Sequence, residues 1–150
     1  MNPQILVDAD ACPVVDETIA VAKRFGVPVT LITDTAHWMQ REGAEIITVE
    51  KGSDSADFRL VNMVRKGDVV VTQDYGLAAM ALSKGAYILN QNGSRYTNEN
   101  IDGLLMSRHI GKKIRRAGGR TKGPSKRTKE QDERFVSALE ALLQQILAIN

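Results

Sequence analysis

The chain has 150 residues, 43% of them hydrophobic, and a net charge of +2, which is sufficient for one hydrophobic core and predicts a single domain over residues 1–150. Its N-terminus lacks the basic and apolar stretches of a signal peptide, and no apolar run reaches membrane-spanning length, so we expect a cytoplasmic protein without membrane contacts. Cys12 is the only cysteine, beside two histidines, which excludes an internal disulfide and leaves too few soft ligands for a zinc site.

Positive charge is concentrated in one segment. Residues 1–107 carry nine Lys or Arg and 14 Asp or Glu, whereas residues 108–129 carry ten Lys or Arg and no acid. This separation predicts a polyanionic partner, and we expect nucleic acid; a solvated basic tail is the alternative. The candidate phosphate-binding residues are Lys112, Lys113, Arg115, Arg116, Arg120, Lys122, Lys126 and Arg127.

Strands and helices alternate over the first 90 residues. Apolar runs predict strands at about residues 4–9, 27–33, 44–50, 68–73 and 86–89. Apolar residues at helical spacing predict a helix after each of the first, third and fourth strands, ended by Gly26, Gly67 and Gly85. This alternation predicts a three-layer α/β domain with a central, mostly parallel five-stranded sheet.

Two further helices are predicted in the last third of the chain. The first, at 98–117, begins apolar and ends basic, and it leads into a Gly-rich basic linker, so we expect a mobile basic segment at about 108–129. The second, at about 128–149, has an apolar stripe that should dock onto the domain. Thr128 and Gln131 fit a capping box at its start.

Polar residues follow the predicted strands. Asp8 and Asp10 alternate on the first strand, so they should project together from its carboxyl tip if the strand continues that far. The carboxyl ends of parallel strands meet at one edge of a sheet, where open α/β sheets bind their ligands. We therefore expect this edge to gather the acids of the first strand with the residues that follow the third, fourth and fifth strands, namely Asp54, Asp57, Asp74 and Asn90.

These oxygen-bearing side chains suit Mg²⁺ or Mn²⁺, either of which can activate water against a phosphodiester. The candidate metal ligands are Asp8, Asp10, Asp54, Asp57 and Asp74, with Ser53, Thr72 and Asn90 as outer-sphere candidates. Most of these acids could instead serve the N-termini of helices. Asp8 has no such role, because a carboxylate that ends an apolar strand costs free energy unless it is paired.

Four motifs give the chain a resemblance to a known family. Val-Asp-Ala-Asp-Ala-Cys-Pro-Val at 7–14, Lys-Gly-Ser-Asp-Ser-Ala-Asp at 51–57, Thr-Gln-Asp-Tyr-Gly-Leu-Ala at 72–78 and Arg-Thr-Lys-Gly-Pro at 120–124 closely resemble the bacterial YaiI/YqxD family. That family is grouped with PIN-like nuclease domains. The resemblance implies a metal-dependent nuclease acting on RNA, a homodimer, and catalytic roles for Asp8, Asp57 and Asp74. Asn90 departs from the PIN pattern, which often has an acid there, and this weakens a second metal site.

Two other functions fit parts of the sequence. The pair Asp8 and Asp10, with Thr33, Lys84 and Asp74, is similar to the motifs of haloacid-dehalogenase phosphatases, in which Asp8 would be the nucleophile and Asp10 the general acid. That interpretation leaves the basic segment and the acids after the third strand unused. A nucleic-acid-binding or regulatory protein without catalysis is the remaining alternative.

Overall fold

A six-stranded sheet forms the centre of the molecule in the computed structural model, which describes residues 2–34, 40–50, 55–118 and 126–149. The strands lie in the order β3-β2-β1-β4-β5-β6. The first five strands along the chain are parallel, and β6 is antiparallel to β5. Along the chain the elements are β1 Ile5–Asp8, α1 Val15–Phe25, β2 Val29–Asp34, β3 Glu45–Val49, α2 Ser55–Met63, β4 Val69–Val71, α3 Tyr75–Ser83, β5 Tyr87–Leu89, β6 Arg95–Tyr96, α4 Ile101–Arg116 and α5 Lys129–Ile149.

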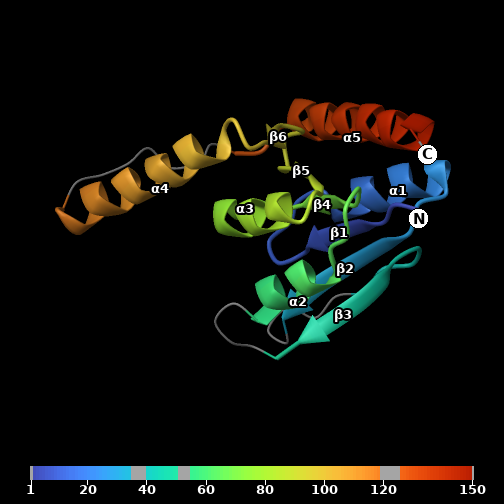
Figure 1. Cartoon of the computed structure of the whole chain (residues 1–150), viewed down its shortest axis with the longest axis horizontal. Helices are drawn as coiled ribbons and strands as arrows, with labels where there is room; N and C mark the ends of the chain where they lie inside the picture. The colour runs from blue at the N-terminus through green and yellow to red at the C-terminus, as the bar shows by residue number, and fades with distance from the viewer. Residues whose placement is uncertain (1, 35–39, 51–54, 119–125, 150) are drawn as a thin grey trace.

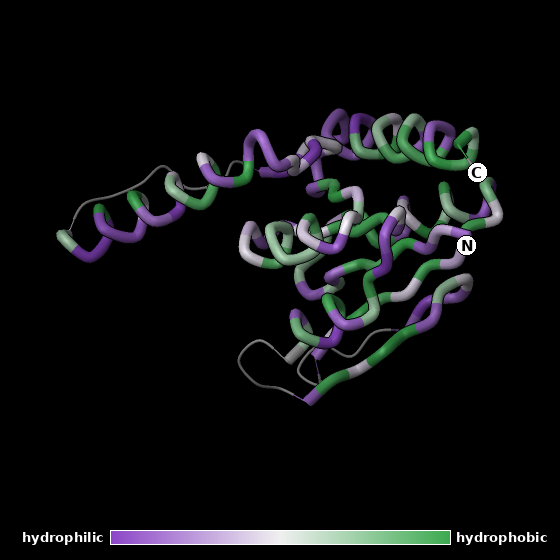
Figure 2. Tube along the Cα trace, viewed as in Figure 1, coloured by the Kyte–Doolittle hydropathy of each residue, from purple (hydrophilic) through white to green (hydrophobic). Residues whose placement is uncertain are grey.

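Helices cover both faces of this sheet, which confirms the predicted three-layer α/β fold (Figure 1). Ile5 and Val7 of β1 pack with α1 and α5 on one face, whereas Leu6 packs with α2 and α3 on the other. Both faces are therefore buried, which explains the continuous apolar runs of the central strands. Figure 2 shows these runs as hydrophobic stretches in the middle of the molecule.

The predicted count of five strands misses β6. This strand contains only Arg95 and Tyr96, too few residues to show an alternating pattern. The chain returns to it through a turn in which Asn90 Oδ1 accepts hydrogen bonds from the backbone N–H groups of Asn92 and Ser94. That turn places β6 beside β5 at the edge of the sheet.

Helix α4 projects from the body of the molecule (Figure 1). Ile101 at its start is buried, Leu104 and Leu105 are half-buried, and from Met106 onward nearly every residue is exposed. The helix predicted at 98–117 is confirmed as α4, whose first turns pack against α3 through Leu104 and Leu105; the mobility expected of residues 108–129 stays a prediction. Residues 119–125 lie outside the described chain.

The C-terminal helix docks as predicted. Phe135, Leu139 and Leu143 of α5 are fully buried against α1 and the sheet. The capping box at its start is confirmed, since the Thr128 N–H donates to Gln131 Oε1 at 2.8 Å and the Gln131 N–H donates to Thr128 Oγ1 at 3.3 Å. No helix in the described ranges combines the length and apolarity needed to cross a bilayer.

Candidate active site

Asp8 ends the central strand β1, between β2 and β4, at the carboxyl edge of the sheet. Its Oδ2 accepts a hydrogen bond of 2.8 Å from the hydroxyl of Thr72, which follows β4 and is buried. Burial raises the pKa of Asp8 to about 6 against the opposing effect of the Thr72 hydrogen bond, and the negative charges of Asp57, Asp10 and Asp74 raise it further. Asp8 is therefore an incompletely compensated carboxylate with three acidic neighbours.

Asp10 does not continue the strand beside Asp8. The strand ends at Asp8, Ala9 is buried, and Ala11 adopts a left-handed conformation with φ of 59°. This turn directs Asp10 toward the end of β2, where its Oδ1 accepts a hydrogen bond from the Thr33 hydroxyl and its two oxygens lie 3.4 and 3.3 Å from the Asp34 nitrogen. The expected parallel projection of the two aspartates is thus replaced by an anchored Asp10.

Asp74 has two structural partners. It is the N-cap of α3, with Oδ1 accepting from the Leu77 N–H at 3.1 Å, as its sequence position allows. The same oxygen lies 3.7 Å from Nη1 of Arg108 on the projecting helix α4. The backbone N–H of Asp74 donates to Thr72 Oγ1 at 3.0 Å, so the Thr72 hydroxyl joins Asp8 to the start of α3.

These residues line two pockets that share Asp74 and Arg108. One, of about 370 Å³, is lined by Asp8, Asp10, Asp74 and Arg108 together with Ala11, Gln73 and Tyr75. The other, of about 220 Å³, includes Asp57 from the first turn of α2 and again Asp74 and Arg108. The structure therefore brings together four of the five candidate metal ligands at one edge. Asp54 and Ser53 lie outside the described residues.

The donor set of this cavity fits a hard divalent cation. Its charged donors are carboxylate oxygens, which Arg108 faces across the cavity. The pKa of Asp8 is raised chiefly by burial and further by the negative charge of these neighbours. No three acids, His or Cys of the described chain are close enough to surround an ion by themselves. Mg²⁺ retains several waters and is commonly held by one or two carboxylates, so an open acidic pocket of this kind is compatible with it.

The candidate phosphate-binding residues differ in their surroundings. The exposed ones on α4 are Lys112, Lys113, Arg115 and Arg116. Lys126 is also exposed but follows α4, and Arg120 and Lys122 lie outside the described ranges. Arg127 is instead engaged within the protein: its Nε lies 2.6 Å from Asp132 Oδ1. The Asn90 side chain organises the turn before β6.

Lys84, the cation of the phosphatase alternative, lies away from the cavity, and the thiol of Cys12 is unreactive. Lys84 caps the far end of α3, about 15 Å along the helix from Asp74, given ten residue steps at about 1.5 Å each. Burial raises the pKa of the Cys12 thiol to about 11, which keeps it protonated and a poor nucleophile at neutral pH. Thr33 holds Asp10.

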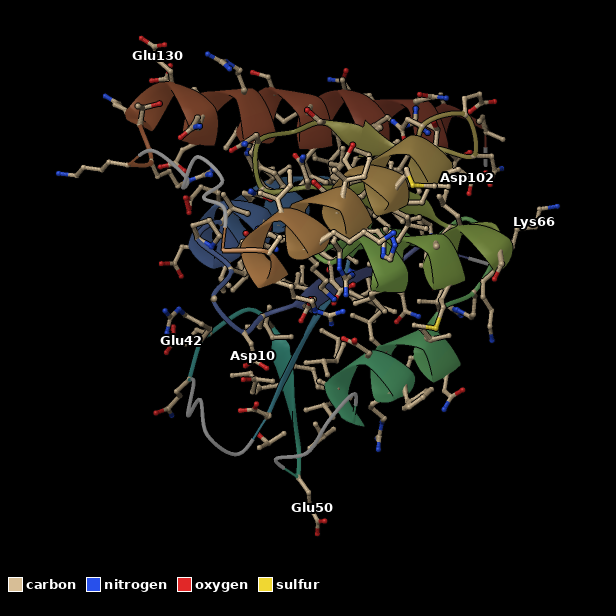
Figure 3. The ribbon with its side chains drawn as sticks, turned by 90° about the vertical axis from the view of Figure 1, so that its left-hand side faces the viewer. Asp10, Glu42, Glu50, Lys66, Asp102 and Glu130 are labelled. Carbon is tan, nitrogen blue, oxygen red and sulfur yellow. The ribbon has the colours of Figure 1, made fainter. Side chains whose placement is uncertain are left out.

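Sequence reasoning did not identify Arg108 as the partner of Asp74, nor the side chains of Gln73 and Tyr75 as walls of the cavity. Arg108 is one of ten basic residues in its segment, and only the direction of α4 distinguishes it from the others. Figure 3 looks at the side of the molecule from which α4 projects and shows Asp10 on that side. The acidic edge and the basic helix are therefore neighbours.

Comparison with known proteins establishes the family. A family profile described as "Uncharacterized BCR, YaiI/YqxD family" matches residues 6–145, so the chain belongs to this family. It is 59% identical to a UPF0178 protein of Ruminiclostridium cellulolyticum, over 91% of this chain and 89% of that protein. It is 54% identical to one from Exiguobacterium sibiricum and 53% identical to one from Clostridium acetobutylicum, in each case over 93% of this chain and 96% of the relative. No solved structure matched the chain.

Proposed function

We propose that this protein is a Mg²⁺- or Mn²⁺-dependent nuclease that hydrolyses phosphodiesters in RNA at the carboxyl edge of its sheet. The observation that carries the proposal is the gathering of three further carboxylates around the buried Asp8, whose pKa burial, and then these negative charges, raise to about 6. A protein gains nothing in stability from gathering three more acids around a buried carboxylate. A cation bound among these carboxylates would offset their mutual repulsion and the cost of burying Asp8 in its charged form.

The aspartates of the pocket and the two threonines that contact them have separate roles in this proposal. Asp8, Asp57 and Asp74 would hold the ion, directly or through water, and the ion would supply Lewis-acid activation of water and of the phosphodiester. Thr72 orients Asp8 through its hydroxyl, and Thr33 fixes Asp10 as an outer-sphere acid. Asp54 remains a further candidate ligand.

The positive charge of the projecting helix α4 favours a polyanionic substrate. Lys112, Lys113 and Arg116 are exposed on α4, and Arg108 of the same helix reaches Asp74 in the pocket. A nucleic-acid backbone lying along α4 would therefore be guided by these cations toward the acidic edge. This helix contains no Phe, Tyr or Trp, so we expect it to contribute mainly affinity for the phosphate backbone.

The phosphatase interpretation receives less support. Its cationic motif would be Lys84, but that residue lies at the opposite end of α3 from the cavity. Asp10, its general acid, is bound by the Thr33 hydroxyl and points toward β2. Non-catalytic nucleic-acid binding would use α4 equally well, but it gives no role to the acidic pocket.

The proposal is tested with end-labelled single-stranded RNA and DNA, purified protein and Mn²⁺ or Mg²⁺. The double variant Asp8→Asn, Asp74→Asn should cut the cleavage rate by at least the roughly 10- to 100-fold that losing even an outer-sphere metal partner costs. Asp102→Asn, an exposed acid of α4 that Figure 3 shows away from Asp10, is the matched control. Equal cleavage by the double variant would place the site elsewhere, and trapping of a phosphoryl group on Asp8 would favour the phosphatase.

A further inference from the structure

The smaller of the two acidic pockets has an apolar lining beside its charged groups. This pocket, of about 220 Å³, is formed by residues of α2, α3 and α4, and its large apolar side chains are Phe58, Leu77 and Met80. Leu77 is buried, whereas Phe58 of α2 is 58% exposed and Met80 of α3 is 36% exposed. Two exposed apolar side chains therefore line the same pocket as the carboxylates of Asp57 and Asp74.

Core packing does not explain the position of Phe58. Helix α2 buries Leu60 and Val64 against the sheet, whereas Phe58 belongs to neither hydrophobic cluster of the core. The favourable free energy of burying a Phe side chain is therefore largely forgone in the described structure. Single exposed apolar residues are common, but two that line one pocket rimmed by charged groups are typical of a binding surface.

The ring of Phe58 also differs from other aromatic rings of this half of the sheet. Tyr75, which lines the larger pocket, packs edge-to-face against Tyr96 with ring centroids 5.6 Å apart. The ring of Tyr87 lies 5.3 Å from the guanidinium carbon of Arg95. Within the described ranges Phe58 has no contact of either kind. Its ring is therefore available to stack on a planar group of a ligand.

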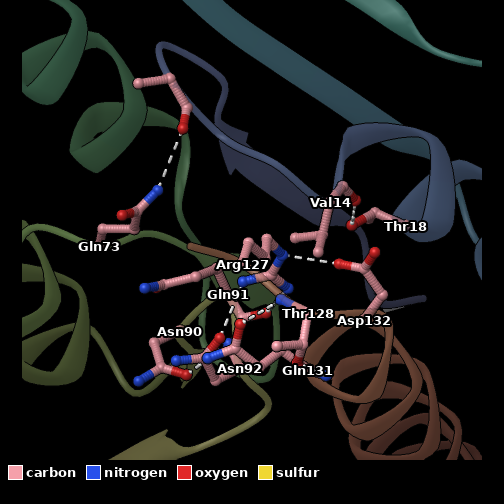
Figure 4. Close-up of polar contacts among 11 residues, drawn as sticks. Val14, Thr18, Gln73, Asn90, Gln91, Asn92, Arg127, Thr128, Gln131 and Asp132 are labelled. Carbon is pink, nitrogen blue, oxygen red and sulfur yellow. Dashed lines mark hydrogen bonds and ion pairs between the residues drawn. The ribbon is translucent and has the colours of Figure 1, made fainter. Parts of the chain in front are cut away.

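The cation of the pocket indicates the charge of that ligand. Arg108 lines both acidic pockets, and its side chain is 44% exposed although its Nη1 lies 3.7 Å from Asp74 Oδ1. Arg127, by contrast, is held by Asp132 and Asn92 in a neighbouring part of the structure (Figure 4). Arg108 is thus the accessible guanidinium beside the apolar lining, and it suits an anionic group such as a phosphate.

A nucleotide within a strand combines the two features that the pocket would bind. Its base is a planar ring that stacks on aromatic side chains, and its phosphate carries the negative charge. A protein partner would need a broader apolar surface, because a stable interface buries about 800 Å² on each side. The exposed apolar residues among the described lining of this pocket are Phe58 and Met80 alone.

We propose that Phe58, with Met80 beside it, is a stacking surface for one base of a single-stranded nucleic acid whose neighbouring phosphate lies at Arg108. Every base has an aromatic face, so this contact should tolerate any sequence. Because Phe58 directly follows Asp57 on α2, the stacked base would lie next to the phosphodiester at the acidic edge. This inference rests on the proposed nuclease function for the choice of ligand, and it adds base binding to the phosphate contacts of α4.

The test measures binding by fluorescence anisotropy, using the full chain in Ca²⁺, which also takes oxygen ligands. A gel checks that the strands stay intact. A labelled decamer of uridines is compared with a decamer of abasic riboses, which keeps every sugar and phosphate. The wild type should bind the uridine strand about 5- to 150-fold more tightly, the factor expected for one stacked base. Phe58→Ala and Phe58→Leu should lower that ratio at least about fivefold, and Phe58→Tyr, which retains a ring, should keep it.

Three further measurements serve as controls. Phe58 is exposed, so its variants should unfold close to the wild-type temperature. Ile149→Ala removes an exposed apolar side chain at the end of α5 and should keep the wild-type ratio. Arg108→Gln should weaken binding of both strands alike, because both carry the same phosphates. Uridine monophosphate should bind at least about tenfold more weakly than the decamer, because it lacks the further phosphates that α4 would contact.

The outcomes separate this inference from the proposed function. A wild type that binds the two strands equally, or a Phe58→Ala variant with the wild-type ratio, overturns the stacking surface. If Phe58→Ala keeps the ratio but dissociates a dimer in sedimentation, Phe58 belongs to a contact between copies of the chain.

The placement of the ligand is tested by the other variants. Arg108→Gln with wild-type affinity for both strands removes the phosphate from this pocket, and uridine monophosphate that binds as tightly as the decamer overturns the assignment to a strand. Cleavage in Mn²⁺ by a protein that binds both strands equally would retain the nuclease and refute the stacking surface. Binding that depends on the bases and on Phe58, without cleavage, would retain the surface and refute the nuclease.

Discussion

The hydroxyl of Thr72 donates a hydrogen bond of 2.8 Å to Oδ2 of Asp8. Asp8 ends β1 and Thr72 follows the neighbouring parallel strand β4, both at the carboxyl edge of the sheet, and the same hydroxyl accepts a hydrogen bond of 3.0 Å from the backbone N–H of Asp74. Thr72 is therefore the polar group that holds the first and fourth strand ends in one arrangement. It is also the contact that most directly favours the charged form of Asp8.

Thr72→Val removes this hydroxyl while keeping the shape of the side chain. At pH 8 the charged Asp8 loses its donor, so we expect a loss of about 1.5–3 kcal/mol in the free energy of unfolding, as for hydrogen bonds to charged groups. At pH 4 the carboxyl is protonated and the loss should be smaller. Urea unfolding at both pH values measures this, and Thr72→Ser, which retains the hydroxyl, should stay close to the wild type.

Asp8→Asn should stabilise the protein at neutral pH in the absence of metal. The folded-state pKa of about 6 lies above the ordinary value of 3.8, so the folded protein binds more protons than the unfolded chain between these values and loses stability as the pH rises through them. The penalty is absent below pH 3.8 and complete above pH 6. We expect Asn to gain on the order of 1–3 kcal/mol at pH 8 and almost nothing at pH 4. A gain of equal size at both pH values would contradict this origin.

Divalent cations should act through the same carboxylate. If Mn²⁺ is present at ten times its Kd, linkage predicts about 1.4 kcal/mol of stabilisation, or about 3–6 °C in Tm for a chain of this size. The shift should be present at pH 8, and it should fall at pH 5 because protons compete for Asp8. Differential scanning fluorimetry of the wild type and Asp8→Asn tests this, and an equal shift in the two proteins would show that the ion binds elsewhere.

The basic face of α4 should set the affinity for nucleic acid. Replacing Lys112, Lys113 and Arg116 together by Gln should weaken binding of single-stranded RNA and flatten its salt dependence by about 0.7 in logarithmic slope for each phosphate that the helix no longer neutralises. Fluorescence anisotropy between 50 and 200 mM salt, a range over which screening is strong, measures both. Lys23→Gln and Lys66→Gln on the body are the matched controls. An unchanged slope would mean that the strand does not follow α4.

Gly93 should be intolerant of a side chain, unlike Gly103. A Cβ atom on Gly93 would lie 2.7 Å from the backbone oxygen of Arg134 and 2.9 Å from Ala138 Cβ, at a φ of 83°. Gly93→Ala should therefore destabilise the protein by about 1–3 kcal/mol and disturb the turn that carries Gln91. Gly103 has open space around it within α4, so Gly103→Ala should stabilise by about 0.5–1 kcal/mol. Thermal unfolding of the two variants gives the comparison.

Local pattern was sufficient for most of the fold. The runs around Val7, Leu31 and Val70 are continuous because both faces of their strands are covered, and each predicted strand of the first 90 residues appears within two residues of its expected bounds. The miss is the two-residue strand at Arg95, which is too short for periodicity, whereas the helix predicted at 98–117 appears as α4.

The places of Asp8, Asp57 and Asp74 in the sequence were enough to predict that they approach one edge, because parallel strands end on the same side of a sheet. The tertiary structure alone decided where those side chains point. Asp10 turns to β2 because Ala11 takes a left-handed conformation, and Arg108 meets Asp74 because α4 leaves the body at that edge. Arg127 likewise meets Gln91 and Asn92, about 35 residues earlier in the chain, since turn geometry and helix docking set such contacts and leave no period in the sequence.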